Sequence, residues 1–207
     1  MKKVYSAVIC AAVIGWAGCA MALPSDYEWT AADFFTPTDL TTSVNGNSQF
    51  SITYENAAWE SAFGLYDVNG RNFKIFSGAQ EPGAQVTVTY KLDNGDFYAS
   101  KDGIDWTELD AVFGFYFKTI VPGGDDYWWY TEQSKNFDGL EHIKVAFNDY
   151  SKEVMIFLDD QPGGGDRDFN DMKIRANDLA PVPEPTTMLL FGAGLAGLAA
   201  VGRRRKN

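Results

Sequence analysis

The sequence predicts an all-β fold, an antiparallel β-sandwich or jelly roll, built as a single domain between two terminal targeting segments. Three observations predict it. Apolar residues in the middle of the chain alternate with polar ones at a period of two, which is typical of half-buried strands. Turn signals that contain glycine separate these runs at short intervals, as they do in sandwiches and jelly rolls. About 160 residues lie between the terminal segments, which suits one domain.

The predicted strands are short and are separated by turn signals at short intervals. They cover residues 49–54, 71–76, 85–90, 112–117, 127–130, 143–147 and 154–158, with a last strand through Met172 and Ile174. The turns between them are predicted at Asn69-Gly70, Pro82-Gly83, Asn94-Gly95, Asp102-Gly103, Gly123-Gly124 and Asp138-Gly139. The unbroken apolar run 154–158 indicates a central strand that is covered on both faces. Residues 55–62 instead predict about two turns of helix.

The N-terminus, residues 1–22, has the pattern of a secretory signal peptide. Lys2 and Lys3 precede a short apolar run, and Ala20 and Ala22 form an A-x-A site, so that cleavage is expected before Leu23.

The two cysteines, Cys10 and Cys19, both lie in this leader. An alternative is a lipoprotein signal with Cys19 as the lipidated residue, for which Trp16 is a poor neighbour. The exported domain, residues 23–180, is therefore expected to have no disulfide and no thiolate metal site.

The domain is strongly acidic. The formal net charge of the chain is -11, and all 28 acidic residues lie between Leu23 and Pro185, whereas only 11 of the 17 basic residues do. The balance between Leu23 and Pro185 is therefore -17. Such a surface repels nucleic acid and anionic lipid, so we expect neither as a partner, and it attracts divalent cations.

The C-terminal segment, residues 181–207, has three parts in order. These are the motif Val182-Pro183-Glu184-Pro185, an uncharged stretch at 186–202 rich in Gly, Ala and Leu, and a cluster formed by Arg203, Arg204 and Arg205. The stretch is at the lower length limit for a transmembrane helix, and the arginines would hold its end in the cytoplasm.

These three parts resemble the PEP-CTERM sorting signal of Gram-negative bacteria. The resemblance implies export across the inner membrane and transient anchoring through the C-terminal segment. It further implies processing near Pro-Glu-Pro by an exosortase-type enzyme, in cells that produce exopolysaccharide or biofilm.

A second resemblance covers residues 50–176. The runs at 61–70 (SAFGLYDVNG), 113–117 (FGFYF), 130–136 (YTEQSKN), 141–147 (EHIKVAF) and 164–172 (GGDRDFNDM) are similar to domain of unknown function 4114, a bacterial family often found with the same sorting tail. Because no activity is established for that family, the resemblance implies a fold and an exported setting but no chemistry.

The acidic loop from Asp159 to Asp171 is the candidate metal site. If the last strand extended backwards, Asp168 and Asn170 would face the core with Met172, and burying an unpaired carboxylate is costly. The chain is therefore expected to leave the sheet before Asn170, with Phe169 as an apolar anchor. Oxygen donors at alternate positions are typical of the first half of a calcium loop. The predicted Ca²⁺ ligands are Asp159, Asp160, Asp166, Asp168, Asn170 and Asp171. The alternative is a purely structural turn in which the Asp and Asn side chains cap their own backbone.

The aromatic run Tyr127-Trp128-Trp129-Tyr130 places two rings on each face of a strand. One pair is expected in the core, and the other either stacks on sugar rings or packs under a loop. His142 is the chain's one histidine, and we interpret it as structural, since a single imidazole makes no His-rich metal site.

Together these features predict an exported, non-enzymatic protein of the cell surface or extracellular matrix, associated with exopolysaccharide and stabilised by Ca²⁺. A carbohydrate-binding module is the alternative function. A glycosidase-like enzyme that uses two carboxylates is a third.

Overall fold

The computed structural model describes residues 23–41, 44–57, 60–77, 81–164 and 166–183. The predicted signal peptide, its cleavage residues Ala20 and Ala22, and the predicted membrane stretch at 186–202 lie outside these ranges. Within them, no helix is long and apolar enough to cross a membrane.

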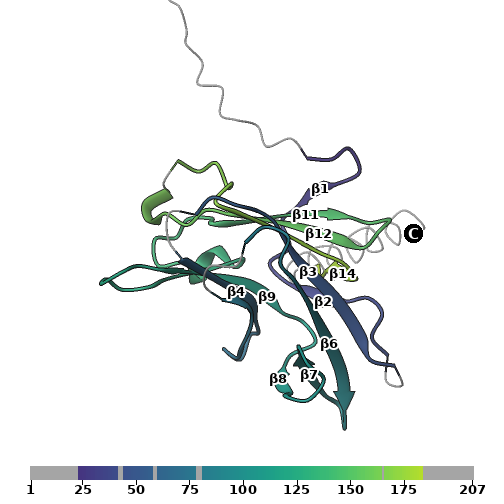
Figure 1. Ribbon diagram of the computed structural model, residues 1–207. Helices are drawn as coiled ribbons and strands as arrows, with labels where there is room; N and C mark the ends of the chain where they lie inside the picture. Colours follow the sequence, from purple (N-terminus) through teal and green to yellow (C-terminus); the bar gives the residue numbers. More distant parts are fainter. Residues whose placement is uncertain (1–22, 42–43, 58–59, 78–80, 165, 184–207) are drawn as a thin grey trace, which may run out of the picture.

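The described chain is almost entirely β-strand, arranged in three antiparallel sheets (Figure 1). The largest sheet has eight strands in the order β1-β11-β12-β13-β3-β6-β7-β8. Their bounds are β1 Glu28–Thr30, β11 Ile143–Asn148, β12 Glu153–Leu158, β13 Met172–Ala176, β3 Gly46–Glu55, β6 Gln85–Asp93, β7 Asp96–Ser100 and β8 Thr107–Leu109.

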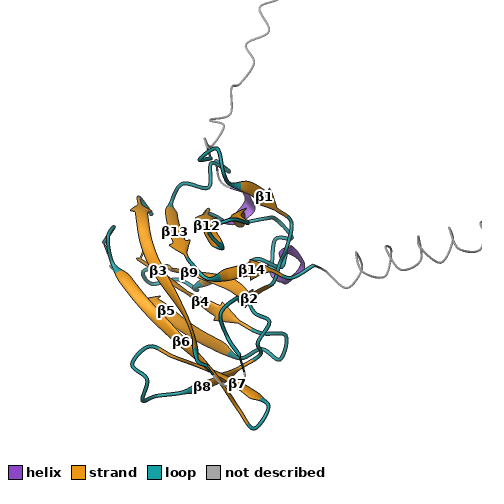
Figure 2. Cartoon of the chain, turned by 90° about the vertical axis from the view of Figure 1, so that its right-hand side faces the viewer, coloured by secondary structure: helices purple, strands orange, loops and turns teal. Residues whose placement is uncertain are grey.

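A four-stranded sheet covers one face of the first, in the order β10-β9-β4-β5. Its strands are β10 Tyr127–Tyr130, β9 Gly114–Ile120, β4 Glu60–Tyr66 and β5 Asn72–Ser77. A third, two-stranded sheet pairs β14 Leu179–Pro181 with β2 Phe35–Pro37. Two short 3-10 turns complete the described structure, η1 Gln133–Lys135 and η2 Pro162–Gly164. Figure 2 shows β7 and β8 at one end of the molecule and β1 at the other.

The hydrophobic core lies between the two larger sheets. It combines inward side chains of both, such as Phe50 and Ile156 from the eight-stranded sheet with Phe63, Phe117 and Trp129 from the four-stranded one. Direct ring contacts cross the interface, since the ring centroids of Phe50 and Phe63 lie 6.2 Å apart. Burial of large aromatic rings is the dominant stabilising contribution in such an interface, and the predicted all-β, antiparallel architecture is confirmed.

The turn predictions are confirmed at the level of the backbone. A positive φ is found at a glycine in each of the six predicted turns, at Gly70, Gly83, Gly95, Gly103, Gly123 and Gly139. This left-handed conformation strains residues that carry a Cβ, which is why glycine occupies it.

The predicted central strand is confirmed as β12. It pairs with β11 on one side and with β13 on the other. Val154, Ile156 and Leu158 face the core, while Phe157 packs with Ala146 and Phe169 in a second, smaller cluster on the opposite face.

The predicted helix at residues 55–62 is wrong. Glu55 is the last residue of β3, and β4 begins at Glu60. Glu and Ala are good helix formers, but intrinsic helix propensity is a weak guide that tertiary context can override. That preference is outweighed here because Phe63 and Leu65 alternate into the core while β4 pairs along its length with both β5 and β9.

Candidate functional site

The acidic loop joins two neighbouring strands at the same end of the eight-stranded sheet. β12 ends at Leu158 and β13 begins at Met172, so the chain leaves the sheet before Asn170, as predicted. The backbone N–H of Asp171 donates to the carbonyl oxygen of Leu158 at 3.1 Å. Asp159 and Asp171 are thereby held near one another at the two strand ends.

Three of the six predicted ligands lie at these strand ends. Asp159 is 1% exposed and Asp160 is fully buried. The N–H of Asp160 donates to Oδ2 of Asp171 at 2.7 Å. In Asp159, Oδ1 accepts the N–H of Gln161 at 3.2 Å, whereas the buried Oδ2 has no hydrogen-bond partner within the described chain.

The other three predicted ligands lie on a curl of the same loop. Arg167 and Phe169 both have a positive φ, 54° and 55°. The N–H of Asp168 donates to Asp166 Oδ1 at 3.4 Å, and the N–H of Asn170 donates to Asp168 Oδ1 at 3.1 Å. The side-chain amide of Asn170 also donates to Asp168 Oδ2. These are the self-capping turns of the structural alternative.

Phe169 anchors the curl. Its side chain is buried in the smaller cluster with Phe157 and Ala146, and Lys144 Nζ lies 4.0 Å from its ring centroid. The predicted apolar anchor is confirmed, although it lies on the face of the sheet opposite the main core.

The charges around these carboxylates are mostly of the same sign. Burial, followed by the neighbouring charges of Asp160, Asp159 and Asp168, raises the pKa of Asp171 to about 7. Burial also raises the pKa of Asp159, to which the charges of Asp166 and Asp160 add, while His142 acts in the opposite direction. The ionised forms of these aspartates are therefore unfavourable in the folded chain.

The six predicted ligands do not form one ready-made metal centre. Across the described ranges, no group of three or more His, Cys, Asp or Glu side chains is gathered as a metal site. The strand ends carry Asp159, Asp160 and Asp171, and the curl carries Asp166, Asp168 and Asn170.

His142 is buried next to the acidic loop. Its Nδ1 lies 3.1 Å from the carbonyl oxygen of Asp159, and its Nε2 lies 3.0 Å from Asp138 Oδ2. Its ring also stacks on Trp129, with centroids 3.7 Å apart. Both ring nitrogens and one ring face are thus engaged, in agreement with a structural role.

The aromatic run forms the edge strand β10 and divides as predicted. Trp129 is fully buried, and its Nε1 donates to Thr119 Oγ1 at 3.2 Å. Tyr127 packs against the same core. Trp128, 36% exposed, and the half-buried Tyr130 lie on the opposite, outer face.

Two further aromatic residues on this outer face were not predicted. The rings of Tyr116 and Trp128 have centroids 5.2 Å apart, and those of Tyr66 and Tyr130 are 4.9 Å apart. The tyrosines lie close against glycines, since a Cβ on Gly114 would come within 2.4 Å of Tyr66 Cε1. In both 63–66 and 113–116 a glycine stands two residues before the tyrosine, on the same face of the strand, and this pattern carried the signal. We call Tyr66, Tyr116, Trp128 and Tyr130 the aromatic face.

A pocket of about 280 Å³ adjoins the aromatic face. Its lining includes Tyr66, Tyr130, Asn72 and Lys135. Rings beside amide and ammonium groups are a combination suited to hydroxyl-rich ligands.

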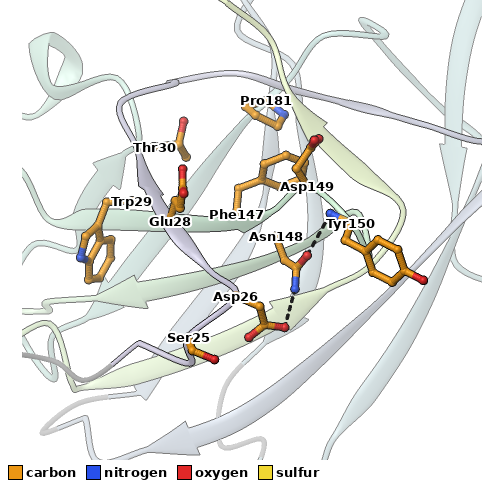
Figure 3. Close-up of a pocket in the computed structure, with 10 residues that line it drawn as sticks. All are labelled: Ser25, Asp26, Glu28, Trp29, Thr30, Phe147, Asn148, Asp149, Tyr150 and Pro181. Carbon is orange, nitrogen blue, oxygen red and sulfur yellow. Dashed lines mark hydrogen bonds between the residues drawn. The ribbon is translucent and has the colours of Figure 1, made fainter.

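A larger pocket, of about 830 Å³, lies beside β1 and β11 (Figure 3). Asn148 Nδ2 donates to Asp26 Oδ2 at 2.7 Å in its wall. The rings of Trp29 and Tyr150 lie at opposite ends of the group of lining residues in Figure 3, and Tyr150 is 98% exposed. Pro181, the last residue of β14, also lines this pocket.

The end of the folded domain leads directly into the predicted sorting motif. The N–H of Val182 donates to the carbonyl oxygen of Phe34 at 2.8 Å, and Pro183 is the last described residue. Residues 181–206 match the PEP-CTERM protein-sorting motif. The chain carries this sorting signal. It is therefore an exported protein that is anchored transiently in the membrane and processed by an exosortase-type enzyme.

The match covers Val182, Pro183, Glu184 and Pro185 and the arginines Arg203, Arg204 and Arg205, of which Glu184 and the residues after it lie outside the described structure. No curated protein and no solved structure matches the chain. The resemblance of residues 50–176 to domain of unknown function 4114 receives no support from these comparisons and stays a prediction.

Proposed function

We propose that this chain is a non-enzymatic component of the cell surface or extracellular matrix, released from its membrane anchor by exosortase-type processing and retained among exopolysaccharide. The observation that carries the proposal is the sorting motif, which begins at the last residue of the final strand. The β-domain is then the cargo of the sorting system. Its acidic surface favours solubility outside the cell and disfavours nucleic acid and anionic lipid.

The non-enzymatic assignment is supported by the surroundings of the acidic loop. A glycosidase needs two carboxyl groups that flank a bound sugar. Asp159 is almost fully buried, and Asp171 accepts a backbone hydrogen bond. Side chains placed in this way serve the architecture of the loop better than they serve a substrate.

Fractionation of cells that express the chain tests the proposal. The wild-type protein is expected in the surface and matrix fractions. A variant with Glu184→Ala and Pro185→Ala is expected to stay in the inner membrane. A control with Glu81→Ala, an exposed acid far along the chain from the motif, should behave as the wild type. Equal distribution of all three proteins would overturn the proposal.

Carbohydrate binding is the second candidate, and the aromatic face favours it. Trp128 points outward with Tyr130 beside it, next to a pocket that contains an amide and an ammonium group. The rings could stack on a sugar, and the polar groups could hydrogen-bond to it. Affinity electrophoresis in gels containing exopolysaccharide tests this. Trp128→Ala should weaken retention about tenfold, the equivalent of roughly 1.4 kcal/mol.

The matched control is Trp29→Ala. Trp29 is 47% exposed, and it lies on β1 in the other large sheet, so its removal should leave retention unchanged. If Trp29→Ala alone abolished retention, the sugar would bind at the pocket of Figure 3, and a role for the aromatic face would be contradicted.

A further inference from the structure

We propose that β14 belongs to the segment that the exosortase-type enzyme binds, and that this strand must detach from β2 before the chain is processed. The inference rests on the processing step that the sorting motif implies, and it adds a requirement for local opening of the folded domain. The partner is the processing enzyme, and it meets the domain at the two-stranded sheet of β14 and β2.

The first argument is the short distance between the fold and the membrane. The N–H of Val182 donates to the carbonyl oxygen of Phe34 at 2.8 Å, so the chain is bonded to the domain up to this residue. Residues 183–185 alone separate it from the predicted membrane stretch at 186–202. Three fully extended residues span at most about 10 Å. An enzyme that acts on the motif at the membrane surface therefore meets the folded domain.

The second argument is the conformation of the bound substrate. Peptides are commonly bound as extended strands, through hydrogen bonds to their main chain. In the folded domain β14 is already paired with β2 (Figure 2), from Leu179 opposite Pro37 to Pro181 opposite Phe35. On its other side, the N–H of Leu179 donates to the carbonyl oxygen of Lys152 at 3.1 Å. Because these backbone groups are engaged within the domain, binding of β14 by the enzyme requires the strands to separate.

The third argument is that the β2–β14 pair is held less firmly than the larger sheets. A two-stranded sheet is only marginally stable by itself, and each strand contains a proline, Pro37 or Pro181, which has no N–H to donate. The fully buried side chain of Leu179 opposes opening, since it lies in the main core. Segments with few bonds open at a lower free energy than the whole domain. We therefore expect β14 to open while the two larger sheets stay folded.

A joint for this movement lies between the end of β13 and the start of β14. Asp178 has a positive φ of 55°, a left-handed conformation that is uncommon for a residue with a Cβ. Just before it, the Oδ1 of Asn177 accepts the N–H of Gln49 at 2.6 Å, which fastens the chain to β3. Rotation at Asp178 would release residues 179–182 and leave β13 in place.

A reversible cross-link between the two strands tests the proposal. Thr36 and Ala180 are directly opposite one another, and antiparallel partners have Cα atoms about 4.5 to 5.5 Å apart, within the range of a disulfide. Thr36→Cys with Ala180→Cys should therefore form a disulfide in the exported domain, as thiol labelling would verify. Both natural cysteines lie in the predicted leader.

The measurement is the rate of C-terminal processing, followed by pulse-chase in cells that produce the enzyme. The disulfide should slow processing about tenfold or more, because processing of a closed segment follows the population of its open form. Dithiothreitol should restore the wild-type rate. An oxidised variant that is processed as fast as the wild type would overturn the proposal.

The matched control places the same cross-link in another strand pair. Asn47→Cys with Thr89→Cys joins β3 to β6, where Thr89 Oγ1 donates to Asn47 Oδ1 at 2.9 Å. This variant should be processed at the wild-type rate. If it were slowed as much as the β2–β14 variant, a disulfide anywhere in the domain would impede processing, and the role of β14 would be refuted.

A longer connection gives a second test without a change inside the fold. Inserting about eight Gly and Ser residues between Val182 and Pro183 adds a flexible linker, which supplies extended backbone to the enzyme while β14 stays paired. The insertion should speed processing of the wild type and remove the effect of the β2–β14 disulfide. A cross-linked protein that stayed slow despite the insertion would contradict the proposal.

The sorting motif is tested separately. Glu184→Ala with Pro185→Ala changes the motif itself and should block processing whether or not the disulfide is reduced. Normal sorting of that variant would overturn the proposed function, whereas normal processing of the oxidised β2–β14 variant would overturn only the requirement for strand separation. The two failures therefore give different results.

Discussion

The backbone N–H of Asp160 donates to Oδ2 of Asp171 at 2.7 Å, which ties together the ends of two neighbouring strands. The bond holds a carboxyl group beside two other aspartates in a half-buried position. Because ionisation there is opposed by burial and by charges of the same sign, the stability of the strand ends is expected to depend on pH.

In a calcium-free buffer, the contribution of Asp171 to stability should fall as the pH rises from about 4 to about 7. The pKa of Asp171 is raised from 3.8 to about 7 in the folded chain. Between these values the folded state keeps a proton that the unfolded state has lost, so each step up in pH favours unfolding. Above pH 7 the loss is complete.

Urea unfolding of the wild type and of Asp171→Asn, in chelator across pH 4 to 8, measures this effect. The difference in unfolding free energy should move in favour of the variant as the pH rises. Since the other titrating groups are common to both proteins, a difference that is constant with pH would contradict the raised pKa.

The two tryptophans of β10 should differ sharply in their effect on stability. Trp129→Ala removes a fully buried ring that donates to Thr119 and stacks on His142, and should cost about 3 to 5 kcal/mol. Trp128→Ala truncates an outward ring and should cost about 1 kcal/mol or less. Chemical denaturation of the two variants measures both values. Equal losses would contradict the assignment of these neighbours to opposite faces.

Gly64→Ala should destabilise the four-stranded sheet. An added Cβ would lie 2.2 Å from the carbonyl oxygen of Phe73 and 2.7 Å from the ring of Tyr116. Because the first of these atoms belongs to a paired strand, relief requires a backbone shift, and we expect a loss of about 1 to 3 kcal/mol.

The control is Gly124→Ala, where the nearest atom to an added Cβ is a side-chain methyl of Val121 at 3.0 Å. Its Tm should stay close to that of the wild type. A Gly64→Ala protein as stable as this control would show that the rings of the aromatic face do not lie against the sheet as described.

Most of the longer strands were predicted from the sequence. They show an alternation of apolar and polar residues, and turns that contain glycine separate many of them. Both signals are local in the chain. The strands β1, β2, β8 and β14 were missed, each of three residues and too short to show a period of two. The strands β4 and β7 were also missed. These strands are specified by the segments that pair with them. The wrong helix at 55–62 has the same origin, since β4 is specified by pairing with two strands that follow it in the chain.

The acidic loop was likewise predicted only in part. The alternation of side chains along the last strand correctly predicted that Asp168 and Asn170 lie outside the sheet and that Phe169 is buried. It could not separate the buried Asp159 and Asp160 from the outer Asp166 and Asp168, because that difference depends on how the loop folds over the strand ends. Half of the aromatic face was predicted. The alternation along β10 put Trp128 and Tyr130 on one face of the strand. Their neighbours Tyr116 and Tyr66 were missed because they come from other strands.

Export followed by removal of the terminal segments is tested most directly by mass spectrometry of the protein recovered from the cell surface or medium. We predict an intact mass clearly below the 22.9 kDa of the full chain, with an N-terminal peptide that begins at Leu23 and no peptide from residues 186–207. Recovery of the protein only from the inner membrane, with the 186–207 segment still attached, would contradict processing and delivery to the surface.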